Sequence, residues 1–186
     1  MKYDKKKAIG HSFLAALETE FFGVFIFLFF IALTRPLGKF ANVFLGLMGI
    51  LTIMCIMADF GIKEGGKAIQ KVKLHGEEPC RNYGFRLGAF AMIPSYVTLI
   101  VLLLAKAGII GNFFPIYKLL NACFYPFVDL MARSVKAVDI SFIVLAVCAV
   151  YPVLYMISAG IGFKIGYDQI DLKEKFMYKK DNKDDD

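Results

Sequence analysis

Three carboxylates lie within or beside the long apolar runs of this sequence, and this position makes them its best candidates for chemistry: Glu18, Glu20 and Asp59. A carboxylate at the middle of a bilayer costs about 2.5 to 3.5 kcal/mol on insertion scales, so an ionisable group in such a run usually marks a functional site. Glu20 and Asp59 could share a proton or a cation. Alternatively, each carboxylate could reach water at a helix end or pair with a nearby cation, such as Lys63 or Arg86.

The sequence lacks the common catalytic and metal-binding patterns. His11 and His75 each stand alone, without a His-Glu-x-x-His pattern. There is no Gly-x-Ser-x-Gly turn and no phosphate loop that ends in Gly-Lys-Ser or Gly-Lys-Thr. The cysteines fall in four separate segments, without the paired spacing of zinc or redox sites: Cys55, Cys80, Cys123 and Cys148. We therefore expect no enzymatic activity, no catalytic residue, no metal and no cofactor.

The composition is typical of a membrane protein. Hydrophobic residues make up 58% of the 186 residues, Phe occurs 19 times, and the mean hydropathy is +0.60. A soluble domain of this size carries a smaller apolar fraction. The formal net charge is +6, but the basic residues flank apolar runs instead of forming one polar surface. This pattern indicates membrane topology and argues against nucleic acid as a partner.

The apolar runs predict an all-α integral membrane protein, because a transmembrane helix needs about 20 apolar residues. Four such helices are expected, at about residues 13–33, 40–60, 84–105 and 140–163. Pro94 and Pro152 should kink the third and fourth helices. Residues 34–39 should form a tight turn, and residues 61–83 should form the main polar loop, with a flexible glycine-rich start.

The segment at about 113–131 differs from these runs because it is amphipathic. Its apolar residues recur every three or four positions, while Lys118, Asn121, Tyr125 and Asp129 occupy the other face. We expect a helix that lies in the membrane interface or re-enters the membrane between the third and fourth spans. A fifth span is the alternative.

The distribution of cations predicts the topology. Of the 22 lysines and arginines, the N-terminus, residues 63–86 and the tail from residue 164 hold 4, 6 and 6. The positive-inside rule then places these three regions in the cytoplasm. We expect the membrane domain to lie in the cell membrane. The expected organisation is a cytoplasmic N-terminus at 1–12, a membrane domain of two helical hairpins at 13–166, and a charged cytoplasmic tail at 167–186.

Small residues recur at one depth of the predicted membrane domain. The pattern Gly84-Phe85-Arg86-Leu87-Gly88 returns as Gly162-Phe163-Lys164-Ile165-Gly166, which Ser158 extends by one turn. Glycines four residues apart let helices approach closely in lipid. We therefore predict antiparallel packing of the third and fourth spans through Gly84, Gly88, Ser158, Gly162 and Gly166. The cations Lys63, Arg86 and Lys164 should contact lipid headgroups.

These features favour a non-catalytic accessory or assembly subunit embedded in the membrane. The expected partners are the lipid bilayer, with anionic lipid at the cytoplasmic face, and a second copy of the chain or another membrane protein. The alternative is a small transporter or channel component in which Glu20 and Asp59 handle a cation.

Overall fold

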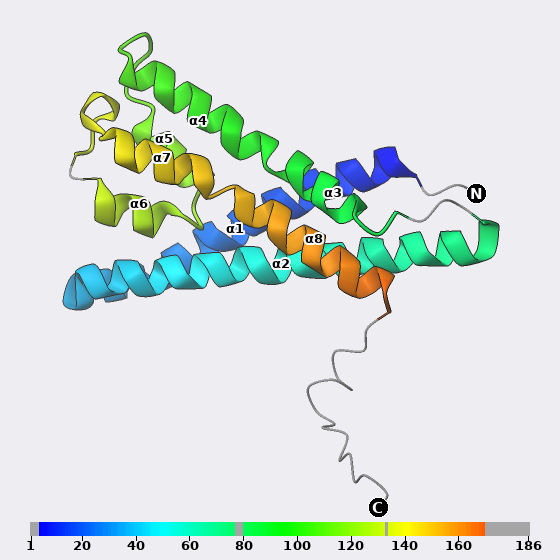
Figure 1. The fold of residues 1–186 in the computed structure, drawn as a ribbon. Helices are drawn as coiled ribbons and strands as arrows, with labels where there is room; N and C mark the ends of the chain where they lie inside the picture. Colours follow the sequence, from blue (N-terminus) through cyan, green and yellow to red (C-terminus); the bar gives the residue numbers. More distant parts are fainter. Residues whose placement is uncertain (1–3, 77–79, 133, 170–186) are drawn as a thin grey trace, which may run out of the picture.

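The computed structural model describes residues 4–76, 80–132 and 134–169, and within these ranges all regular structure is helical (Figure 1). Four continuous or kinked helices are long and apolar enough to cross a membrane: Lys5–Phe30, Lys39–His75, Tyr83–Lys106 and Phe142–Tyr167. This confirms the predicted all-α class and the four apolar helices.

The helices follow one another along the chain with short connections. In order they are α1 (Lys5–Leu37), α2 (Lys39–His75), α3 (Tyr83–Ala91), α4 (Ile93–Lys106), α5 (Phe114–Leu120), α6 (Tyr125–Met131), the 3-10 helix η1 (Ala137–Asp139), α7 (Phe142–Val150) and α8 (Val153–Tyr167). The third apolar helix breaks just before Pro94 and the fourth breaks at Pro152. Both breaks were predicted, because proline cannot donate the helical hydrogen bond.

α2 is longer than predicted, which corrects the interpretation of residues 61–83 as a polar loop. Residues 61–75 continue the helix, and α2 ends at His75. Gly76 caps it with a left-handed φ of +63°, and the Gly76 N–H donates to the carbonyl of Val72 over 3.0 Å. Packing explains the difference. Gly61 and Gly65 are buried against α8, and this contact offsets their low helix propensity. The turn before α2 is also tighter than expected, since α1 reaches Leu37 and only Gly38 separates the two helices.

α8 packs between α2 and α3. A Cβ at Gly162 would lie within 3 Å of the backbone of Ala58 in α2, and a Cβ at Gly84 in α3 would collide with the side chain of Phe163. Figure 1 shows α8 crossing α2 at close range, with α3 on its other side. Close backbone approach of this kind is how small residues join helices in lipid.

The amphipathic segment forms two short helices instead of the predicted single one. α5 packs against α4, and α6 packs against α2. The turn between them, residues 121–124, is buried. Pro126 explains the break, since it has no N–H to continue a helix from α5 and is favourable in the first turn of a new one. Figure 1 places both short helices at the end of the molecule where α1 meets α2.

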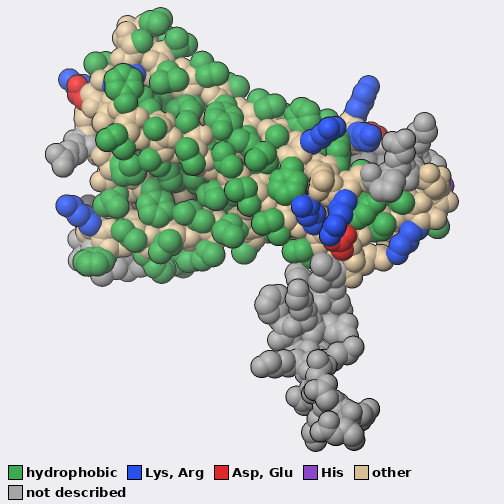
Figure 2. Space-filling view, viewed as in Figure 1, with side chains coloured by type: hydrophobic (Ala, Val, Ile, Leu, Met, Phe, Trp, Pro, Cys, Tyr) green, Lys and Arg blue, Asp and Glu red, His purple; other side chains and the backbone are tan. Residues whose placement is uncertain are grey.

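The outer surface is largely apolar. Phe21, Phe25 and Phe29 of α1 are 67%, 61% and 74% exposed. Figure 2 shows hydrophobic side chains over most of the visible face, while many of the lysines and arginines gather at the end that holds the N-terminus. So large an apolar surface is unusual in a soluble monomer and typical of a surface that faces lipid.

Candidate functional site

Glu20 is the meeting point of three elements. It lies near the middle of α1, where its Oε1 accepts a hydrogen bond of 2.5 Å from the hydroxyl of Tyr155 in α8. Its Oε2 accepts a hydrogen bond of 3.3 Å from the backbone N–H of Cys123, in the turn between α5 and α6. Each carboxylate oxygen therefore forms a hydrogen bond with a different part of the chain.

The turn around Cys123 fits closely against both long helices. The thiol of Cys123 donates to the carbonyl of Thr19 over 3.2 Å. A Cβ added at Gly23 or Gly49 would meet the backbone of Cys123 at 3 Å or less. Only glycine leaves room for the turn at these two positions, one in α1 and one in α2. The turn thus packs between α1 and α2, and Cys123 forms two hydrogen bonds with α1, one to Glu20 and one to Thr19.

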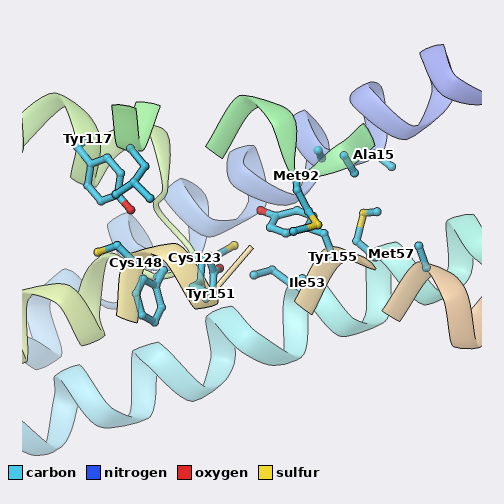
Figure 3. Packing of buried hydrophobic residues seen from close by; sticks show 14 of the residues in the cluster. Ala15, Ile53, Met57, Met92, Tyr117, Cys123, Cys148, Tyr151 and Tyr155 are labelled. Carbon is cyan, nitrogen blue, oxygen red and sulfur yellow. The ribbon is translucent and has the colours of Figure 1, made fainter. Parts of the chain in front are cut away.

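Further polar side chains surround this contact. Asn121 donates to the hydroxyl of Thr98 over 3.0 Å and to the carbonyl of Tyr117 over 3.1 Å. Tyr151 stacks on Phe124, with ring centroids 4.0 Å apart. Figure 3 shows Tyr117, Tyr151 and Tyr155 within the same buried cluster as Cys123 and Cys148. Within the described ranges, Asn121 Oδ1 and the Tyr151 hydroxyl are buried without a hydrogen-bond partner. The core therefore contains a polar layer in otherwise apolar surroundings.

Glu18 and Asp59 lie in a different place from Glu20. Both line an open groove of about 400 Å³ between α1 and α2, together with His11, Leu14, Ala15, Cys55, Ile56, Phe60, Lys63, Glu64 and Lys67. Asp59 forms an ion pair of 2.5 Å with Lys63, one turn further along α2. The structure thus brings Glu18 and Asp59 to one groove, whereas Glu20 has its partners in α8 and in the turn at Cys123.

The same groove holds a residue that sequence reasoning missed. Glu64 is only 3% exposed, and its Oε1 lies 2.6 Å from Lys67 Nζ and 3.2 Å from His11 Nδ1. Glu64 falls within the loop predicted at residues 61–83, so its burial was not expected. The spacing of Glu64 and Lys67, which places them on one face of a helix, was the available signal.

The four predicted packing glycines are at helix contacts, and two of them have the predicted partner helix. Gly84 and Gly88 of α3 face Phe163 and Met156 of α8. Gly162 and Gly166 face Ala58 and Ile62 of α2 instead of α3, and Ser158 is buried in α8. Of the predicted headgroup residues, Lys63 and Arg86 are exposed, and the Lys164 ammonium lies 5.0 Å from the ring centre of Phe85.

No protein-family model, curated protein or solved structure matches this chain. Function must therefore be argued from the geometry.

Proposed function

We propose that this chain is a multi-pass protein of the cell membrane that acts as a non-catalytic accessory or assembly subunit. The observation that carries the proposal is the pair of hydrogen bonds that Glu20 accepts. Its two oxygens accept hydrogen bonds from α8 and from the turn at Cys123, so the carboxyl group of Glu20 joins α1 to both. A carboxyl group whose two oxygens both have protein partners is better suited to a structural role than to exchange with a passing ion.

In this proposal α5, the turn at 121–124 and α6 form a re-entrant hairpin. Gly49, which contacts the turn, follows Gly38 by 11 residues, and this corresponds to about 16 Å along a helix. The hydrocarbon layer is about 30 Å thick, so the turn would reach roughly its middle. Backbone groups at that depth need internal partners. Glu20 supplies one of them for Cys123.

The distribution of cations supports cytoplasmic placement of both termini. Figure 2 shows many of the visible lysines and arginines at the end of the bundle that holds the N-terminus. The opposite end, where Gly38 joins α1 to α2, would face the outside. Two hairpins follow from this arrangement, one of α1 and α2 and one of the kinked helices before and after the re-entrant segment.

Cation handling by Glu20 and Asp59 is the competing proposal, and the geometry supports it less. Asp59 is paired with Lys63, while Glu20 is bonded to Tyr155 and Cys123. Asp59 lines the groove between α1 and α2, whereas Glu20 is not among its lining residues, so the two carboxylates do not meet there.

Flux measurements in liposomes separate the two proposals. For a structural Glu20, we expect the purified protein to move neither protons nor sodium. Glu20→Gln should lower stability by about 1 to 3 kcal/mol, because the Gln amide can accept from Tyr155 but leaves the N–H of Cys123 without an acceptor. Glu18→Gln is the matched control, two residues away with an exposed side chain, and should change stability by less than about 0.5 kcal/mol. Flux that Glu20→Gln or Asp59→Asn abolishes would favour the transporter.

Purification in a mild detergent tests the accessory role itself. We expect a second membrane protein to elute with the chain at constant stoichiometry, and a Glu20→Gln variant that is still folded to retain it. A chain that elutes alone from native membranes, over a range of mild detergents, would contradict this role.

A further inference from the structure

The structure contains an apolar groove beside the segment 114–125 that is separate from Glu20. Its volume is about 360 Å³, and its walls come from α1, from α5 and the turn after it, and from the loop before η1. This volume is within the usual range of small-molecule sites, about 300 to 1,000 Å³. Leu28 and Leu119 border it and are 59% and 60% exposed, so the groove opens on the surface that would face lipid.

One charged pair accompanies these apolar walls. Lys118 lines the groove, and its ammonium lies 2.6 Å from Asp129 Oδ1. The side chain of Lys118 is 13% exposed and that of Asp129 is 39% exposed. The Lys118 ammonium also lies 4.5 Å from the ring centre of Phe114 and 5.2 Å from that of Tyr125. The groove therefore combines a hydrocarbon surface with one positive group in its wall, Lys118, whose partner Asp129 lies just beside the lining residues.

We propose that this groove binds one zwitterionic aminophospholipid of the phosphoethanolamine class from the outer half of the bilayer. One acyl chain lies along the apolar walls, the lipid phosphate accepts from Lys118, and the lipid ammonium donates to Asp129. A carboxylate has acceptor positions beyond the one that Lys118 occupies. The inference rests on the proposed membrane position of α5 and α6, and it is independent of the accessory role.

Charge complementarity selects this headgroup over two others. The pair of Lys118 and Asp129 has no net charge, so an anionic headgroup would meet repulsion from Asp129 when it approaches Lys118. A phosphocholine headgroup has no N–H to donate to Asp129. A primary ammonium and a phosphate in one headgroup match both side chains.

Native mass spectrometry of the detergent-solubilised full chain tests the proposal. The probes are phosphatidylethanolamine, phosphatidylglycerol and phosphatidylcholine with identical acyl chains. We expect the first to bind about tenfold more tightly than the others, which corresponds to one charge-assisted contact. Lys118→Met and Asp129→Asn should each remove this preference.

A second pair of variants tests the groove without touching the charges. Val135 lines the groove and is 70% exposed, whereas Val138 is 59% exposed and is not among the lining residues. Val135→Trp should reduce binding of phosphatidylethanolamine at least tenfold, and Val138→Trp should leave it unchanged. Thermal stability in detergent checks that each variant is folded.

Three results would overturn the proposal. Preferred binding of phosphatidylglycerol that Asp129→Asn strengthens would assign the site to anionic lipid. Equal binding of all three lipids, unaffected by Lys118→Met and Asp129→Asn, would reduce the groove to apolar packing. Equal effects of the two Trp variants would place lipid binding elsewhere. None of these results bears on ion flux or co-purification, so the proposed function is tested separately.

Discussion

The adjacent glycines Gly65 and Gly66 of α2 should respond in opposite directions to alanine. A Cβ at Gly65 would lie 2.8 Å from the amide nitrogen of Tyr167 and closer still to the carbonyl oxygen of Phe163. A Cβ at Gly66 would meet no atom within 4 Å. Both glycines belong to the same helix. Comparing the two alanine variants therefore separates the effect of helix propensity on stability from the effect of packing against α8.

The expected magnitudes follow from these contacts. Alanine is more favourable than glycine inside a helix by about 1 kcal/mol, so Gly66→Ala should raise the free energy of unfolding by about that amount. Gly65→Ala gains the same propensity, but the atoms that block its Cβ are backbone atoms of α8, so the two helices must move apart. Overpacking costs about 1 to 3 kcal/mol, and lost dispersion contacts along the interface add to it. We expect Gly65→Ala to be destabilising by about 1 to 2 kcal/mol overall.

Reactivity of buried thiols on heating measures this difference. Cys123 and Cys148 are buried, while Cys55 is exposed, so a parent in which Cys55 and Cys80 are replaced by Ser reports unfolding through the two buried thiols. In mild detergent, Gly66→Ala should melt higher and Gly65→Ala lower than this parent, by about 2 to 4 °C per kcal/mol. If Gly65→Ala stabilises as much as Gly66→Ala, α2 and α8 are not in close contact. If Gly66→Ala destabilises, this stretch is not helical.

Two further predictions concern buried side chains and topology. Phe163→Ala should lower the free energy of unfolding by about 3 to 5 kcal/mol, because the fully buried Phe163 ring fills the space at Gly84. The control is Phe29→Ala at an exposed position, which should have little effect on thermal stability in detergent. In intact cells an impermeant maleimide should leave Cys80 unlabelled until the membrane is permeabilised, since Cys80 lies in a cation-rich cytoplasmic connection in the proposed topology; labelling from outside would reverse that topology.

The sequence predicted those features that depend on local composition. Four apolar runs were sufficient to locate the four long helices, and proline chemistry located the breaks at Pro94 and Pro152. The continuation of α2 through residues 61–75 was missed, because glycine and lysine are weak signals for a membrane helix and the stabilising contact comes from α8. The break at residues 121–124 was missed because the 3.6-residue pattern continues across it, although Pro126 was the local signal.

The partners of the small residues and of Glu20 could not be predicted for a different reason. A glycine face indicates that some helix approaches closely, but Gly162 has the same sequence pattern whether it meets α3 or α2. Its choice of α2 depends on Gly61 and Gly65, which α8 meets on the same side of α2. The two donors to Glu20 are the N–H of Cys123 and the hydroxyl of Tyr155, which lie more than 100 residues further along the chain. No periodic sequence pattern indicates either contact. The half-buried carboxylate was visible in the sequence, whereas its hydrogen bonds to Cys123 and Tyr155 became visible only in the structure. Under the proposed role of Glu20, an ionisable group in an apolar run marks a place where helices are joined, and the flux measurements distinguish this from a place where ions pass.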